Sequence, residues 1–120
     1  MRASDLVKAH FPAQQAKAIV GTFDGSVVQA GSGQSTAYAV KAANTHVASG
    51  TGGVILPVAN AGDSFTVMNA AAANCIVYPP TGGKMNDGSA NAGITLADNE
   101  SLMAVCINTT DFMCIIGSAS

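Results

Sequence analysis

From Thr22 onward, the chain alternates between short runs that favour β-strands and clusters of residues that form turns. The runs are rich in Val, Ile and Thr, whose branched side chains suit a pleated sheet. Gly, Pro, Asn and Asp separate them at intervals of about 8 to 12 residues. The pattern predicts eight or nine short strands in one all-β domain over residues 22–120, either a small β-sandwich of jelly-roll-like type or a barrel.

Three local expectations follow from the same residues. Residues 36–47 alternate in polarity, which predicts one long strand or two strands across a bulge. The Gly-rich residues 49–53 are expected to form a flexible loop, and the Ala-rich residues 70–74 a hairpin loop. No internal repeat of fixed length is evident.

The first 21 residues differ from the rest of the chain. Ser4 and Asp5 can cap a short helical turn, Pro12 prevents one unbroken helix, and residues 13–20 contain good helix formers. Three of the five basic residues lie here. We therefore expect residues 1–21 to form a partly helical N-terminal arm.

Charged residues are scarce, at 10% of the chain against about 25% in an average soluble domain. A monomer of this size exposes roughly 6,000 Å², or about one charge per 500 Å². We therefore expect an exterior of small polar residues, much of it covered by copies of the chain or by another protein.

The net charge of −2 and the isolated Lys and Arg residues argue against nucleic-acid binding. Apolar runs are too short for a membrane span, and the start lacks the apolar region of a signal peptide, so we expect neither membrane insertion nor secretion.

The sequence contains no recognisable catalytic or cofactor motif. Cys75, Cys106 and Cys114 are odd in number and lack C-x-x-C spacing, so they are interpreted as small buried hydrophobic residues rather than disulfides or zinc ligands. The carboxylates fall in turns, where capping explains them, although Asp98 and Glu100 leave calcium binding open. We expect neither an enzyme nor a cofactor.

The second half of the chain resembles a module of tailed-bacteriophage virion proteins. The resemblance lies in the Gly-Asp-led strand of residues 62–69, the Tyr-Pro-Pro-Thr-Gly-Gly string within residues 75–83, and residues 97–101. It extends over about residues 53–116. Such modules occur in head decoration (cement) proteins and in head or tail fibres. The resemblance implies a structural protein of the virion.

On this basis the sequence predicts a capsid decoration protein on the exterior of the virion, assembled in the host cytoplasm. Its partners would be the major capsid protein and further copies of itself, with a trimer favoured by the three-fold positions of a shell. The candidate contact residues are the apolar residues of the arm and its junction, namely Leu6, Phe11, Ile19 and Phe23. A fibre or receptor-binding domain is the alternative, and a small-ligand binder would require a lined cavity.

Overall fold

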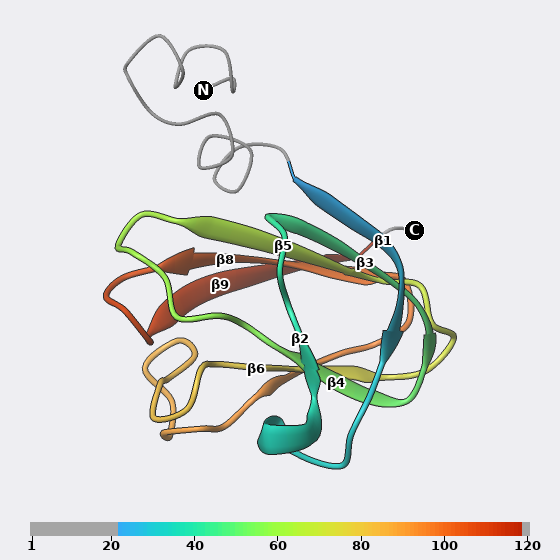
Figure 1. Cartoon of the computed structure of the whole chain (residues 1–120), viewed down its shortest axis with the longest axis horizontal. Coiled ribbons are helices and arrows are strands. Elements are labelled where there is room, and N and C mark those ends of the chain that lie inside the picture. The colour runs from blue at the N-terminus through green and yellow to red at the C-terminus, as the bar shows by residue number, and fades with distance from the viewer. Residues whose placement is uncertain (1–21, 119–120) are drawn as a thin grey trace, which may run out of the picture.

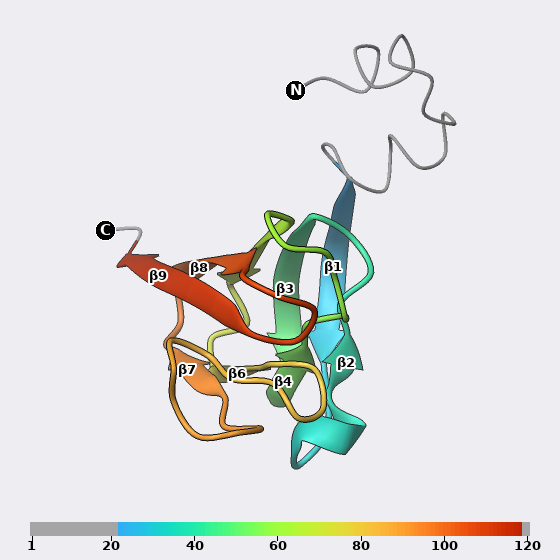
Figure 2. The same cartoon turned by 90° about the vertical axis from the view of Figure 1, so that its left-hand side faces the viewer.

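The computed structural model describes residues 22–118, which form two mixed β-sheets packed face to face. The larger sheet has the order β1-β3-β5-β8-β9, and the smaller has the order β2-β4-β6-β7. Figures 1 and 2 show the two layers. The elements are β1 (Phe23–Gln29), the 3-10 turn η1 (Gln34–Thr36), β2 (Tyr38–Ala39), β3 (Asn44–Gly50), β4 (Gly52–Ile55), β5 (Ser64–Asn69), β6 (Cys75–Tyr78), β7 (Ile94–Leu96), β8 (Glu100–Cys106) and β9 (Phe112–Ser118). The predicted all-β sandwich is confirmed.

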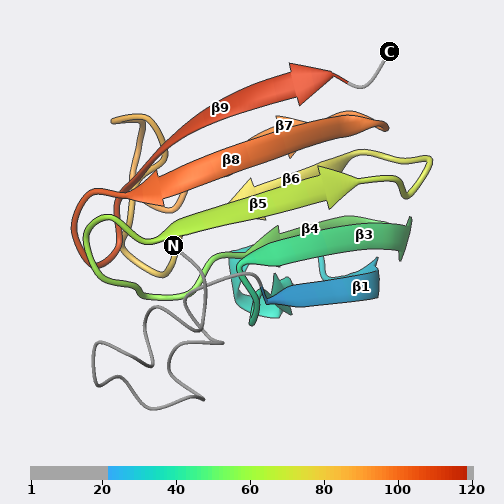
Figure 3. The same ribbon diagram turned by 90° about the horizontal axis from the view of Figure 1, so that it is seen from above.

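The first six strands wind as three successive coils. Each coil places one strand in the larger sheet and the next in the smaller sheet, so β1, β3 and β5 pair in parallel, as do β2, β4 and β6. The last three strands depart from this pattern, because β7 pairs antiparallel with β6, β8 pairs antiparallel with β5, and β9 pairs antiparallel with β8. Figure 3 shows the larger sheet from above, with β1 and β9 at its two edges.

The core lies between the sheets and consists mainly of aliphatic side chains. Val47 and Val67 of the larger sheet and Val54 and Val77 of the smaller sheet are fully buried. Phe112 is the largest fully buried side chain, and its ring meets that of Phe65 edge-on at 6.1 Å between centroids. In β3, β6 and β8, buried residues alternate with more exposed ones, so one face of each sheet lies inward.

The glycines of residues 49–53 form a tight corner between sheets, which corrects the expected flexible loop. β3 extends to Gly50 and β4 begins at Gly52, where φ is +115°. A Cβ at Gly52 would lie 2.5 Å from the carbonyl oxygen of Ala30 in the preceding coil. Adjacent coils approach too closely there for a side chain. The strand expected over residues 36–47 is also divided, because β2 and β3 belong to different sheets.

Buried amide side chains hold the loops at the ends of the coils. Asn69 is 2% exposed; its Nδ2 group donates to the carbonyl oxygens of Ala73, Leu96 and Ala97, and its Oδ1 atom accepts from the amide of Ala71. The Ala-rich segment 70–74 is a loop, as expected. It does not form a hairpin, because β5 and β6 lie in different sheets.

Gln29 plays the equivalent part at the end of β1. Its Nε2 group donates to the carbonyl oxygens of Gly50 and Asn74, which belong to the next two coils. These amides satisfy carbonyl groups that would otherwise be unpaired, because strands that leave one sheet for the other lose their ladder partners.

Candidate functional site

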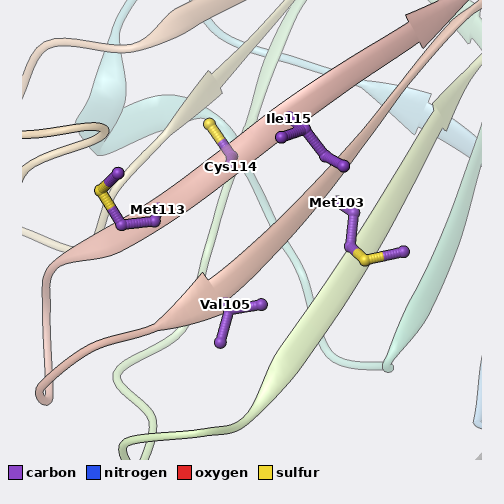
Figure 4. Close-up of a pocket in the computed structure, with 5 residues that line it drawn as sticks. All are labelled: Met103, Val105, Met113, Cys114 and Ile115. Atoms are coloured by element: carbon purple, nitrogen blue, oxygen red, sulfur yellow. The ribbon is translucent and has the colours of Figure 1, made fainter.

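Four exposed apolar side chains form a compact block on the outer surface of the larger sheet. Met103 and Val105 of β8 are 49% and 39% exposed, and Met113 and Ile115 of β9 are 46% and 71% exposed. Met103 lies opposite Ile115, and Val105 lies opposite Met113. We call these four residues the β8–β9 face. With Cys114 they line a groove of about 270 Å³, shown in Figure 4.

Strand alternation explains why these residues point outward. In β8, Leu102, Ala104 and Cys106 are buried, so the residues between them face solvent. Most strands with one solvated side carry polar residues there, yet β8 and β9 carry Met, Val and Ile. Four side chains of this kind expose on the order of 400 Å² of apolar area, the size of a patch that is often functional.

The β8–β9 face also lacks charge. Within residues 101–118 the only ionisable acid or base among Asp, Glu, Lys, Arg and His is Asp111, in the turn between the strands. Its Oδ1 atom accepts from the amide of Lys84 at 3.0 Å, and its Oδ2 atom accepts from Nδ2 of Asn108 at 3.2 Å. This surface therefore suits an apolar partner, with Met side chains able to adapt to its shape.

The carboxylates occupy structural positions in turns and between coils. Asp98 Oδ1 accepts from the amide of Ala72, and Glu100 Oε1 accepts from the amide of Ala97. The two residues considered for calcium thus fix the turn between β7 and β8. Within residues 22–118, no group of three or more His, Cys, Asp or Glu residues is arranged to hold a metal ion.

Tyr38 and the three cysteines also have structural surroundings. The Tyr38 hydroxyl donates to Asp24 Oδ2 at 2.5 Å, and this bond raises the pKa of Tyr38. Cys75 and Cys106 are buried, Cys114 is half-buried, and all three are free thiols. Burial raises the pKa of Cys75 to about 11, and it also raises the pKa of Cys106 and Cys114. A raised pKa keeps each cysteine in the unreactive thiol form rather than as a nucleophilic thiolate.

The candidate contact residues predicted from sequence do not form this face. Phe23 is 63% exposed, but it begins β1, at the opposite edge of the larger sheet from β9. Leu6, Phe11 and Ile19, together with the rest of the expected arm, lie outside the described residues. Sequence reasoning missed the β8–β9 face, although one signal was present. Residues 102–107 and 112–116 are apolar on both alternating faces, which a one-sided strand does not require.

No protein-family model, curated protein or solved structure matches the chain. In the described part of the chain, no helix is long and apolar enough to span a bilayer.

Proposed function

We propose that this protein is a capsid decoration protein that binds the outer face of the major capsid lattice of a tailed bacteriophage and stabilises the head. The observation that carries the proposal is the uncharged, apolar β8–β9 face on a small β-sandwich. Binding of a protein partner over this surface is favourable, because it removes Met, Val and Ile side chains from water.

The chemistry of the exposed residues favours a protein partner over a glycan. Sugar-binding surfaces commonly present aromatic rings, whereas the large exposed apolar side chains of residues 22–118 are Val, Met and Ile, with Phe23 as the single aromatic. The carboxylates described above bind backbone amides in turns, and the thiols have raised pKa values. These features support a structural role for the domain rather than catalysis.

The proposal is tested by sedimenting purified protein with empty phage heads that lack it, and separately with host cells. We expect co-sedimentation with heads and none with cells. The Met113→Asp variant should bind heads at least tenfold more weakly, because it places a charge in the apolar contact. Val58→Asp is the matched control, since Val58 is 66% exposed and lies in a loop outside the face.

Binding to cells without binding to heads would overturn this function in favour of a receptor-binding fibre domain. Equal head binding by the Met113→Asp variant and the unmodified protein would show that the β8–β9 face is not the contact. Circular dichroism of both variants establishes that the sandwich is intact.

A further inference from the structure

The free edge of β9 differs from the three other sheet edges of the described chain. β2 and β7, which border the smaller sheet, are only two and three residues long. β1 is longer, but its register with β3 shifts twice and Ser26 adopts a φ of +58°. Short strands, bulges, charges and prolines are the usual means of preventing edge-to-edge pairing. β9 has none of these, because its seven residues pair with β8 without a shift and include no charge or proline.

Part of the β9 edge is already covered within the chain. Phe112 donates to the carbonyl oxygen of Lys84 and accepts from the amide of Asn86, and the Cys114 amide donates to Asn86 Oδ1. The backbone groups of Phe112 and Cys114 therefore point away from β8. Because outward and inward groups alternate along an antiparallel strand, the N–H and C=O groups of Ile116 and Ser118 also point outward. No strand of the described chain lies beside them.

Both faces of this free segment are apolar. Ile115 on the outer face is 71% exposed, and Ile116 on the other face is 44% exposed. A partner placed against one face of the sheet would leave the other isoleucine in water. A strand added beside β9 contacts both isoleucines, because its own side chains alternate between the two faces.

Gly117 lies between the two outward-pointing residues, and nothing within the described chain requires a glycine there. Its φ is not positive, and a Cβ added to it would meet no atom within 4 Å. Glycine inside a strand weakens it and often marks a place where another backbone approaches closely.

From these observations we propose that β9 pairs antiparallel with β9 of a second copy, about a two-fold axis at Gly117. In this register Ile116 of each copy lies opposite Ser118 of the other, so their N–H and C=O groups form four hydrogen bonds across the axis. The outward N–H and C=O groups of Ile116 and Ser118 are all used, and the hydrogen bond from the Cys114 amide to Asn86 is kept. Ile116 lies diagonally across the axis from Ile116 of the other copy, and Ile115 lies diagonally from Gly117 of the other copy, where no side chain keeps the strands apart.

A second copy is the occupant that fits this edge. The strand β9 carries no charged side chain, so the side chains of two identical edges meet without like-charge repulsion. The free stretch extends only from Ile116 to Ser118, and antiparallel self-pairing uses the same short segment twice and closes on itself. A strand from another protein that paired along all of β9 would meet Met85 and Asn86.

The pairing continues the larger sheet into ten strands and places both β8–β9 faces on the same side, because the axis is perpendicular to the sheet. The contact is smaller than a standard interface of about 800 Å² per partner, so we expect a dissociation constant on the order of micromolar. The trimer favoured by capsid symmetry and this two-fold dimer differ in mass.

The test is sedimentation equilibrium of the purified full chain from about 1 to 200 µM, a range that brackets a micromolar constant. We expect a monomer–dimer equilibrium that reaches twice the 11.9 kDa chain mass. A monomer throughout, or a trimer, would overturn the proposal. Because no capsid is present, this result is independent of whether the protein binds heads.

Variants at the axis test the register. Gly117→Lys and Gly117→Glu have room in the monomer, but each places like charges opposite each other in the dimer, so each should weaken association about threefold or more. An equal mixture of the two should associate more tightly than either alone. If the mixture associated no more tightly than either variant alone, a two-fold axis at Gly117 would be contradicted.

Two further variants separate pairing from general surface effects. Ser118→Pro removes an outward N–H that β8 does not use, and with it two of the four bonds in the dimer, so association should weaken at least tenfold. Val28→Lys, on the exposed β1 edge strand, should leave association unchanged. Equal weakening by Val28→Lys would overturn the assignment to β9. Circular dichroism spectra and melting temperatures establish that each variant is folded.

Discussion

Replacing Asn69 by Ala removes the buried amide that fixes two loops to the end of β5. The Nδ2 group has two hydrogens shared among the carbonyl oxygens of Ala73, Leu96 and Ala97, at 2.8, 3.2 and 3.1 Å. The Oδ1 atom accepts from the Ala71 amide at 3.1 Å. The substitution therefore deletes two donors and one acceptor at a site that is 2% exposed.

The expected loss of unfolding free energy is about 3 kcal/mol, counting roughly 1 kcal/mol for each deleted donor or acceptor. Small domains have total stabilities of about 5–15 kcal/mol, so this is a large fraction. The melting temperature should fall by roughly 10 °C for a chain of this size. Asn69→Asp should be at least as destabilising at pH 7, because it directs a carboxylate oxygen at backbone carbonyls.

Equilibrium urea unfolding followed by circular dichroism measures the effect. Asn44→Ala is the matched control, because Asn44 lies on the neighbouring strand and its Nδ2 group makes one bond, to the carbonyl oxygen of Thr22 at 3.1 Å. We expect that control to lose about 1 kcal/mol or less. If Asn69→Ala lost no more than Asn44→Ala, the loops would not depend on this amide and the reasoning would be refuted.

Two other substitutions probe the coil corner and a buried thiol. Gly52→Ala should lower the free energy of unfolding by about 2–4 kcal/mol in urea unfolding, because its Cβ would meet the backbone of the preceding coil. Gly62 also has a positive φ but has open space around it, so Gly62→Ala should lower it by only about 1 kcal/mol. Similar losses in the two variants would contradict the close approach of the coils at Gly52. Because burial raises the pKa of Cys75 from 9.0 to about 11, its contribution to stability is complete below pH 9. The contribution is lost as pH rises from 9 to 11, because over this range the unfolded state ionises ahead of the folded state. Stability should fall by about 2–3 kcal/mol over this range in the unmodified protein and less in Cys75→Ala; equal pH profiles would refute that cause.

Individual strands were predictable where alternation and flanking turns agree. β5 occupies the predicted residues 64–69 because a Gly-Asp turn precedes it, its inward residues Val67 and Asn69 alternate with outward ones, and the Ala-rich loop follows. β4, β6, β8 and β9 also lie within a few residues of the expected runs. These elements depend on local chemistry that a single sequence contains.

The coiled strand order was not predictable in the same way. Parallel neighbours such as β1 and β3 are joined through another sheet, so no tight turn between them marks the pairing. The coils also lack a sequence repeat, because their inward pairs differ, being Val27 and Gln29 in β1 but Thr45 and Val47 in β3. Core volume and loop hydrogen bonds are shared across coils, and equivalent positions need not carry equal residues.

The scarcity of charge has a more specific meaning once the carboxylates are located. Asp63, Asp98, Glu100 and Asp111 each accept a hydrogen bond from a backbone amide in or beside a turn, so they stabilise loops rather than sheet surfaces. Across residues 22–118 the only Asp, Glu, Lys or Arg residues within strands are Asp24 and Glu100, both near a strand start. The outer sheet surfaces therefore have almost no ionic protection against association. Because the edge of β9 is regular, uncharged and open from Ile116 to Ser118, association should begin there.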